Sequence, residues 1–407
     1  MNKETEKYIS LFEKYAKENY KKCLREAGGK FSSPYFVPGA YYSRELWDWD
    51  SWLTGIALAD IAAGTDISAY QRGCVLDFLR AADGEGRLPI NIVADGESIF
   101  DLKPGVQVNI HKPCLAMQAW FVSERYGDVS WLKDDFSAMK NYIAWYEKNC
   151  YHAESGLFFW INDFAIGVDN DPCVFYRPDR STAAIFLNCL MYSEYLAMEK
   201  LSRRLGDVAE EYAKKAEDLG EAIRRECWDD RDGFFYSADV LLKPVDKNEW
   251  LHSGAPRHWH TLPMRIGVWS GFLPLWNGLA TKEQAERLVR EHYLNEKTFY
   301  APFGVRSVSK AEKMYAIRPS GNPSCWLGPI WINANWFVFS GLLRYGYEKE
   351  AMELAEKTVT LLGRDIERCG DIHEYYHPET GEGILNKGFQ SWNLLAYCMG
   401  AWLKKNG

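Results

Sequence analysis

Apolar residues recur at steps of three and four positions along most of the chain, and this spacing predicts amphipathic α-helices. Segment 129–149 shows the pattern well, since its apolar positions fall on one helical face and its charged positions on the other. The same periodicity predicts helices at residues 3–26, 50–65, 67–80, 110–126, 129–149, 180–205, 206–227, 268–279, 281–294, 330–345, 347–363 and 388–405.

Charge divides the predicted helices into two groups that alternate along the chain. Many charged residues lie on one face of helices 129–149, 206–227, 281–294 and 347–363, which favours an outer position. Fewer charges lie on the helices that start near residues 50, 110, 180, 268, 330 and 388. Short links join each inner helix to the next outer one, and helices joined in this way pack antiparallel.

This alternation predicts an all-α fold, an (α/α)6 toroid of six helical hairpins formed by one domain over residues 1–407. The longer segments, which are rich in Gly, Pro and aromatic residues, then lie together at one end of the toroid. Small β-hairpins are expected within these segments, for instance at 156–161 and 232–240. Functional residues on a rigid scaffold usually lie in such segments.

Aromatic residues are unusually frequent, with 17 Trp, 24 Tyr and 20 Phe in 407 residues. They fill cores, but their faces also stack on sugar rings and line ligand pockets. The net charge is −8 and there is no basic block. This composition argues against a nucleic-acid partner and against an anionic membrane surface, and it favours a small molecule.

The compartment is indicated by what the sequence lacks. No apolar run is long enough to cross a bilayer, and the charged N-terminal segment has no apolar stretch typical of a secretory signal. The ten cysteines show no C-x-x-C spacing. We therefore expect a cytoplasmic protein with reduced thiols. The sequence leaves the oligomeric state open.

The stretch HEYYHPETGEG, residues 373–383, begins with the H-E-x-x-H pattern of zinc proteases. That pattern binds zinc only within a helix, where both imidazoles share one face. Pro378 follows His377 directly, and the residue before a proline avoids helical geometry. We expect no metal and no cofactor here, and Glu374 becomes a candidate catalytic carboxylate instead. His258 and His260 are an equally weak metal pair.

Three further segments carry candidate chemistry. YYSRELWDWDSW (41–52) places Trp47 and Trp49 beside two aspartates, of which one can cap the following helix while the other fits a sugar clamp. GVQVNIHKP (105–113) offers Gln107, Asn109 and His111 as hydroxyl partners, although ordinary loop polarity explains them equally well. Segment 162–180 is rich in aspartate, but its spacing does not match a calcium loop, and a solvated turn is the alternative.

Segment 320–336, SGNPSCWLGPIWINANW, places Trp326 and Trp331 just before a predicted helix. The indoles either line the mouth of the toroid or pack against the start of that helix. Glu374 would then face an aspartate-rich loop across a mouth of tryptophans. Glycoside hydrolysis needs two carboxyl groups on opposite sides of a sugar, one protonated and one ionised, and a closed pocket lined with indoles raises the pKa of the acid.

Six runs resemble glycoside hydrolase family 63 in order and spacing over almost the whole toroid. They are LWDWDSW (46–52), GVDNDP (167–172), FGVRS (303–307), WLGPIW (326–331), HEYYHPETGEG (373–383) and FQSWNLL (389–395). The resemblance implies an inverting, exo-acting α-glycosidase on an (α/α)6 barrel. The short branch of that family includes mannosylglycerate and glucosylglycerate hydrolases.

The resemblance also implies roles for individual residues. Asp169 would be the general acid and Glu374 the general base, with Asp50 and Trp49 holding the sugar. The walls of the sugar site would be built from Trp326, Gly328, Trp331 and Trp392, with Arg306 nearby. The full set of candidate substrate-binding residues is Trp47, Trp49, Asp50, Gln107, His111, Arg306, Trp326, Gly328, Trp331, Tyr375 and Trp392.

The chain departs from the family pattern at two places that bear on substrate choice. It has His111-Lys112-Pro113 where the family often has Q-P-P, and Asn170-Asp171 where the family often has N-S or N-A. A glycerate carboxylate would call for a cation near the mouth. The candidates for that cation are Lys112, Arg177, Arg180 and Arg265.

The expected function is hydrolysis of small soluble α-glycosides, such as glucosylglycerate, mannosylglycerate or α-disaccharides. Two alternatives are kept. A sugar epimerase or isomerase on the same toroid would use histidines, for which His111, His258, His260 and His373 are the candidates. A carbohydrate-binding toroid without catalysis would keep the indoles alone. The sequence does not distinguish glucose from mannose and does not identify the aglycone.

Overall fold

The computed structural model describes residues 3–243 and 257–407, in which the chain forms twelve α-helices. They are α1 (Lys3–Asn19), α2 (Asp48–Ile61), α3 (Ser68–Arg80), α4 (Leu115–Tyr126), α5 (Phe136–Asn149), α6 (Ile185–Leu205), α7 (Glu210–Glu226), α8 (Leu273–Trp276), α9 (Lys282–Arg287), α10 (Ile332–Arg344), α11 (Glu348–Cys369) and α12 (Leu395–Asn406).

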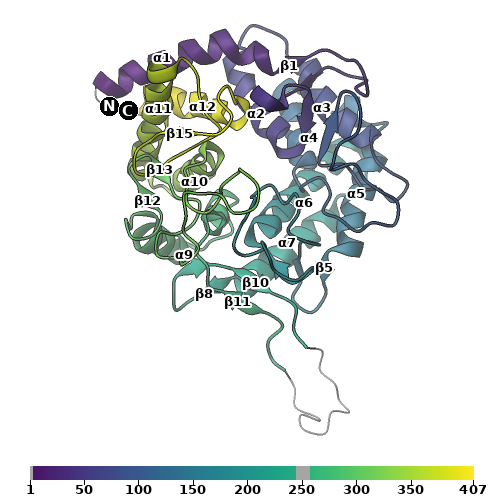
Figure 1. The fold of residues 1–407 in the computed structure, drawn as a ribbon. Coiled ribbons are helices and arrows are strands. Elements are labelled where there is room, and N and C mark those ends of the chain that lie inside the picture. Colours follow the sequence, from purple (N-terminus) through teal and green to yellow (C-terminus); the bar gives the residue numbers. More distant parts are fainter. Residues whose placement is uncertain (1–2, 244–256) are drawn as a thin grey trace.

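The even-numbered helices form a closed inner ring. Around it α2 packs against α4, α4 against α6, α6 against α8, α8 against α10 and α10 against α12, and α12 returns to α2. Odd-numbered helices lie outside, with α7 against α6 and α11 against both α10 and α12. Figure 1 shows the ring, with α1 in purple beside the last helices in green and yellow. This arrangement confirms the predicted (α/α)6 toroid.

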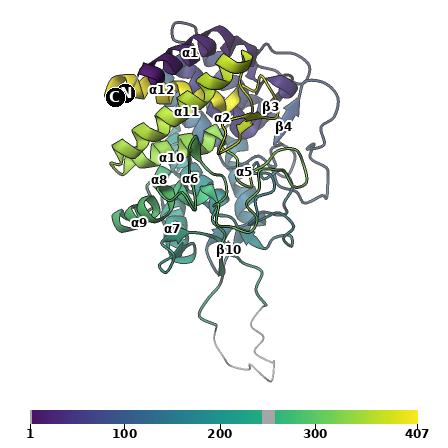
Figure 2. The same cartoon turned by 60° about the vertical axis from the view of Figure 1, so that its left-hand side comes forward.

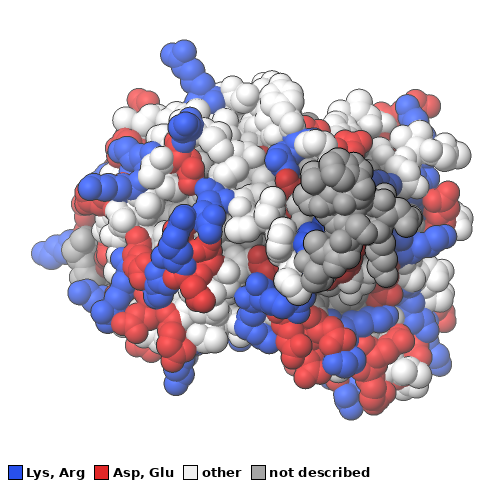
Figure 3. All heavy atoms as spheres, turned by 90° about the horizontal axis from the view of Figure 1, so that it is seen from below, with Lys and Arg blue, Asp and Glu red and all other residues white. Residues whose placement is uncertain are grey.

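The charge pattern explains which helices lie outside. On α7, Tyr212, Leu219 and Ile223 are buried, while Lys214 and Asp218 form an ion pair of 2.6 Å on the opposite face. By contrast, α2 is buried at nearly every position, as expected for a helix enclosed on all sides. Figure 3 shows basic and acidic side chains interspersed on the face seen from below.

Short strands lie in the segments between the helices. They are β1 (Leu24–Arg25), β2 (Tyr35–Phe36), β3 (Glu45–Trp47), β4 (Asn91–Val93), β5 (Tyr151–His152), β6 (Leu157–Phe158), β7 (Thr182–Ala183), β8 (Trp228–Asp229), β9 (Phe234–Phe235), β10 (Ser237–Asp239), β11 (Leu262–Met264), β12 (Tyr300–Ala301), β13 (Gly304–Val305), β14 (Tyr375–Tyr376) and β15 (Gly383–Ile384). In the side view of Figure 2, β3 and β4 lie at the opposite edge of the molecule from α9.

The expected hairpins are present in modified form. β5 pairs with β6 and β8 pairs with β9, each in antiparallel register, at the two places where hairpins were expected. β10 pairs instead with both β7 and β11 and so joins three separate segments. Isolated bridges also link Arg306 to Ile330 and Ile330 to Tyr376. These pairings fix the long segments relative to one another.

Several helix boundaries differ from the prediction for identifiable reasons. Segment 268–279 is not one helix: a 3-10 turn at Trp269–Phe272 precedes the short α8, which carries Pro274 in its first turn. Proline has no N–H and therefore interrupts a continuous helical hydrogen-bond ladder. The helix predicted from residue 180 begins at Ile185, because Thr182 and Ala183 belong to β7.

The first helix supports the loop-bearing end as well as the outer ring. The Tyr15 hydroxyl on α1 donates a hydrogen bond to Asp371 and accepts one from Gln390. These partners lie in the two segments that flank β14 and β15. None of the ten cysteines, all of which lie in described residues, forms a disulfide. Among the described helices, none has both the length and the apolar character needed to cross a bilayer.

Candidate active site

A cavity of about 640 Å³ is formed by the long segments. Its floor consists of four tryptophans, Trp49, Trp326, Trp331 and Trp392, none of which is more than 5% exposed. Its rim includes Ile99, which is 79% exposed. The cavity therefore runs from an open mouth to a buried aromatic floor, and its volume is in the usual range for small-molecule sites.

The tryptophans of the floor support one another. Trp326 and Trp331 stack with ring centroids 3.9 Å apart and planes 5° from parallel. Trp49 packs against Trp392 at 5.1 Å. The Trp331 indole donates to the Cys325 carbonyl at 2.9 Å, which fixes its ring plane. A rigid apolar surface of this kind suits the C–H face of a sugar ring.

Three carboxyl groups from separate parts of the chain line this cavity. Asp50 lies in the first turn of α2, Asp169 in segment 162–180, and Glu374 immediately before β14. Burial raises the pKa of Glu374 to about 8, and the charges of Asp50 and Asp169 add to this increase. Burial likewise raises the pKa of Asp50 to about 7 against the hydrogen bond that Ser391 donates at 2.8 Å. The negative charges in the cavity are therefore coupled.

Asp169 is held in place by its neighbour Asn170. The Asn170 side chain donates to the carbonyls of Ser320 at 3.0 Å and Ser324 at 2.7 Å and accepts from the Trp326 amide at 3.0 Å. Its backbone has a φ of 50°, which asparagine tolerates better than most residues. Burial raises the pKa of Asp169, while hydrogen bonds from Ser324 and Asn322 and the Lys112 charge oppose this. From the sequence, Asn170 was only one polar residue of the aspartate-rich segment, and no role in positioning Asp169 was predicted for it.

Glu374 is held by a residue that sequence reasoning missed. The Asn386 amide donates a hydrogen bond to Glu374 Oε2, and Asn386 is itself only 8% exposed. This bond favours the ionised carboxylate and lowers the pKa of Glu374. The Glu374 amide donates to the Leu385 carbonyl at 3.2 Å, so the β14–β15 hairpin holds both ends of the interaction. The only sequence signal was a polar residue close to the F-Q-S-W-N run.

The H-E-x-x-H pattern has no zinc-protease geometry, because Tyr375 and Tyr376 are extended in β14. His373 Nδ1 lies 2.7 Å from Asp365 Oδ2, whereas His377 Nδ1 accepts from backbone amides of the following turn. Potential ligand atoms of Asp365, Cys369 and His373 lie within 4.8 Å of one another. The Asp365 carboxylate, however, already accepts from the Tyr376 hydroxyl and the Arg368 guanidinium, so this group supports the hairpin.

Five of the predicted binding residues do not line the cavity, namely Gln107, His111, Gly328, Tyr375 and Arg306. Gln107 is exposed and accepts from Arg180 at 3.4 Å. His111 is fully buried beside Phe78, and burial lowers its pKa to about 4. The Gly328 amide donates to Ser307, behind the tryptophan floor. Tyr375 stacks on Trp331 at 4.7 Å and so supports the floor from below.

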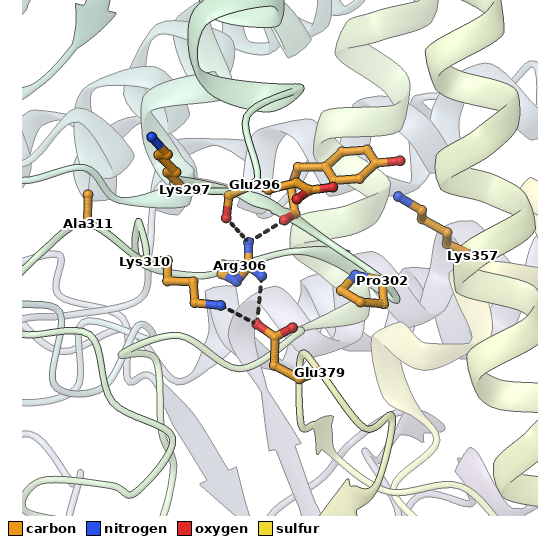
Figure 4. A pocket seen from close by; sticks show the side chains of 9 residues that line it. Glu296, Lys297, Pro302, Arg306, Lys310, Ala311, Lys357 and Glu379 are labelled. Atoms are coloured by element: carbon orange, nitrogen blue, oxygen red, sulfur yellow. Dashed lines mark hydrogen bonds and ion pairs between the residues drawn. The ribbon is translucent and has the colours of Figure 1, made fainter.

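Arg306 lies in a second cavity of about 720 Å³, shown in Figure 4. Its guanidinium contacts Glu379 at 2.7 Å and donates to the Glu296 carbonyl at 3.2 Å. Glu379 belongs to the turn between β14 and β15, and Lys310 contacts it as well, at 3.2 Å. The prediction that Arg306 binds the sugar therefore disagrees with its position. The ion pair instead anchors the hairpin that carries Glu374.

The histidine alternative has no support in the cavity. Among the described residues, no histidine lines it. His373 is paired with Asp365, and His260 lies 3.5 Å from Glu154. Lys112 does line the cavity, although it was considered only as a possible carboxylate partner: its side chain is 2% exposed and its ammonium lies 2.8 Å from Asp48.

The closed ring of helices is the (α/α)6 toroid, and solved structures that share this fold include two enzymes named for sugar substrates. The crystal structure of a family 63 mannosylglycerate hydrolase from Thermus thermophilus, in complex with Tris and D-glycerate, matches with a TM-score of 0.70 and 21% identity over 96% of this chain and 99% of that one. A neutral trehalase from Saccharomyces cerevisiae matches with a TM-score of 0.63 and 18% identity over 91% and 74% of the two chains.

The family model described as the mannosylglycerate hydrolase MGH1-like glycoside hydrolase domain matches residues 41–392. The chain therefore belongs to this family, within glycoside hydrolase family 63. Among curated relatives, a mannosylglycerate hydrolase of Thermus thermophilus is 28% identical over 182 residues, which cover 43% of this chain and 34% of the relative. The match thus spans about a third of that protein's length.

Proposed function

We propose that the protein is an inverting exo-α-glycosidase of small α-glycosides, in which Asp169 is the general acid and Glu374 the general base. The observation that carries this proposal is that both carboxyl groups, from segments far apart in sequence, line one cavity above a floor of buried indoles. Curated relatives are named mannosylglycerate hydrolases, which supports a short α-glycoside as the substrate.

The chemistry follows from these positions. The terminal sugar lies on the tryptophan floor, and Asp50 accepts hydrogen bonds from its hydroxyl groups. The Asp169 carboxylic acid donates its proton to the glycosidic oxygen as the bond to the anomeric carbon breaks. Glu374 takes a proton from a water molecule that attacks that carbon from the opposite face, which inverts its configuration. We expect the two carboxyl groups to be about 6.5–9.5 Å apart, as inversion requires.

The electrostatics favour a state in which one of the two carboxyl groups is protonated and the other is ionised. Burial raises the pKa of Asp169, which is the direction that an acid catalyst needs. The pKa of Glu374 is also raised, but part of this rise comes from the Asp169 charge. Protonation of Asp169 removes that repulsion, and the Asn386 amide stabilises the Glu374 carboxylate directly. The state with one acid and one carboxylate is therefore favoured over the state with two charges.

The proposal is tested with Asp169→Asn and Glu374→Gln. Each substitution keeps the shape of its side chain and is expected to lower kcat by about three orders of magnitude or more, while the melting temperature stays near that of the unaltered protein. The substrates are aryl α-glucosides and α-mannosides, glycosylglycerates and α-disaccharides, and NMR identifies the first-formed anomer. A β-anomer supports inversion. Near-normal turnover in either variant, or an α-anomer as first product, contradicts the proposal.

A further inference from the structure

The mouth of the cavity carries a second set of carboxylates. Glu45, Glu97 and Asp163 line it in addition to the three central carboxyl groups. Glu45 accepts hydrogen bonds from the Trp47 indole at 2.7 Å and from Asn91 at 3.2 Å. Asp163 accepts from the Tyr176 amide at 2.9 Å. All of these donors are neutral, so they orient the two carboxylates and leave their charges uncompensated.

Positive charge is nearly absent from the lining. Lys112 is the single cationic residue among the described residues that line the cavity. Its ammonium lies 2.8 Å from the fully buried Asp48 carboxylate, and it also lies 5.9 Å from the Trp49 ring in the floor. Lys112 is therefore deep in the site, and its charge is already balanced.

The other cations considered for a carboxylate ligand are occupied elsewhere. Arg177 forms an ion pair with Asp239, and Arg265 forms one with Asp229 at 2.6 Å. Arg180 donates to the Asn149 carbonyl at 3.2 Å. None of the three lines the cavity. An anionic ligand that entered the mouth would therefore meet carboxylates, and no described lining residue offers it an available cation. Repulsion between like charges strongly disfavours the binding of such a ligand.

The mouth offers an aromatic wall instead. Phe100 and Phe164 stack with centroids 5.1 Å apart, and Trp47 meets Phe100 edge-on at 5.2 Å. All three line the cavity, and Phe164 is 45% exposed. Such a wall contacts the C–H face of a second sugar ring, while carboxylates such as Glu45 accept hydrogen bonds from its hydroxyl groups.

From this arrangement we infer that the leaving group is neutral: the chain hydrolyses α-linked disaccharides or similar uncharged glycosides and discriminates against glycerate glycosides. The inference rests on the proposed function and narrows it, since it separates this chain from relatives that are named for mannosylglycerate. The carboxylates of the mouth, together with the ion pair between Lys112 and Asp48, determine which leaving group is accepted.

The test compares substrates that differ in one charged group. Initial rates are measured on α-glucosylglycerol and α-glucosylglycerate, on the corresponding mannosides, and on α-linked glucose disaccharides. We expect kcat/KM to favour the neutral member of each pair by about ten-fold or more, and this ratio to shrink at high salt because mouth charges are screened. A glycerate glycoside that is turned over as well as its neutral partner overturns the inference alone. Failure to hydrolyse any α-glycoside overturns the proposed function and the inference with it.

Two charge variants test whether the carboxylates of the mouth cause the preference for a neutral substrate. Glu97→Lys, at the exposed rim, is expected to shift the ratio of anionic to neutral kcat/KM about three-fold or more towards the anionic substrate. Glu211→Lys on the outer helix α7 makes the same change in net charge away from the cavity and is expected to leave the ratio unaltered. Equal ratios in both variants overturn the inference. Arg318, exposed on the segment that leads to Asn322, is replaced by alanine; a specific loss of glycerate turnover in that variant also overturns it.

Discussion

Asn386 donates a hydrogen bond to Glu374 Oε2, and among the described residues no cation forms an ion pair with that carboxylate. Burial raises the pKa of Glu374, and the neutral Asn386 amide favours the ionised form of its carboxyl group. The two residues lie on opposite sides of the β14–β15 hairpin, so the hairpin determines both the position of the proposed base and its charge. This relationship gives the first prediction.

Asn386→Ala is expected to raise the pKa of Glu374 further, because the amide that stabilises the carboxylate is lost. The proposed base acts only when ionised, so kcat/KM falls as the pH falls through its pKa. The acidic limb of the pH profile of kcat/KM should move to higher pH by about one to two units, since a hydrogen bond to a charged group contributes about 1.5–3 kcal/mol. Asn406→Ala, at an exposed site on α12, should leave the limb in place. A limb that does not move contradicts a role for Asn386 in the ionisation of Glu374.

Asp50→Asn is expected to move the same limb in the opposite direction. The negative charge of Asp50 raises the pKa of Glu374, so a neutral amide lowers it and the acidic limb shifts to lower pH. The maximal rate should fall by about a hundred-fold, because the amide accepts fewer hydrogen bonds from the sugar. The pH dependence of kcat/KM on an aryl α-glycoside measures both effects. A shift to higher pH would disprove the coupling.

Substitution of Asn170 tests the connection between segments 162–180 and 320–336. Asn170→Ala removes three buried hydrogen bonds and places alanine at a φ of 50°. We expect a loss of about 2–4 kcal/mol in the free energy of unfolding and a drop in kcat of at least about ten-fold, because Asp169 loses its support. Asn170→Gly removes the same hydrogen bonds but fits a φ of 50° without strain. If the glycine variant keeps full activity, the side-chain hydrogen bonds do not position Asp169.

Glu379→Gln tests whether the second cavity affects the first. The change weakens the ion pair with Arg306, which is 2% exposed, and should cost about 1–2 kcal/mol because Glu379 itself is partly exposed to solvent. Neither residue lines the sugar cavity, so kcat should fall while KM changes little. Lys310→Met removes the more exposed partner of Glu379 and serves as the matched control. A kcat equal to that of the unaltered protein would show that the hairpin position does not depend on this pair.

The toroid could be predicted from the sequence because periodicity and charge act over whole helices. α7 shows both signals, with buried apolar residues on one face and ion pairs on the other. The short α8 was harder to predict, because Pro274 interrupts a segment whose apolar pattern is continuous. At that point the missing N–H of Pro274, and not the apolar periodicity, determines where the helix begins.

The candidate site was predicted in part, and the failures have a common cause. Residues in a long segment can be recognised as functional, but the side to which each one points depends on strand pairing. Arg306 bridges to Ile330, and successive residues of an extended chain point to opposite sides. Trp331 therefore faces the sugar cavity, whereas Arg306 faces the other one. The roles of Asp169 and Glu374 in catalysis stay predictions.

The hydroxyl of Tyr15 has a consequence for biosynthesis. It joins α1 to Asp371 and Gln390, which are 356 and 375 positions later in the chain. One partner lies close to Glu374, and the other precedes Ser391, which binds Asp50. On the ribosome, α1 obtains these partners only after the segments that carry Asp371 and Gln390 have emerged. The cavity cannot be assembled until those segments are synthesised, and the nascent chain must keep α1 from aggregating until then.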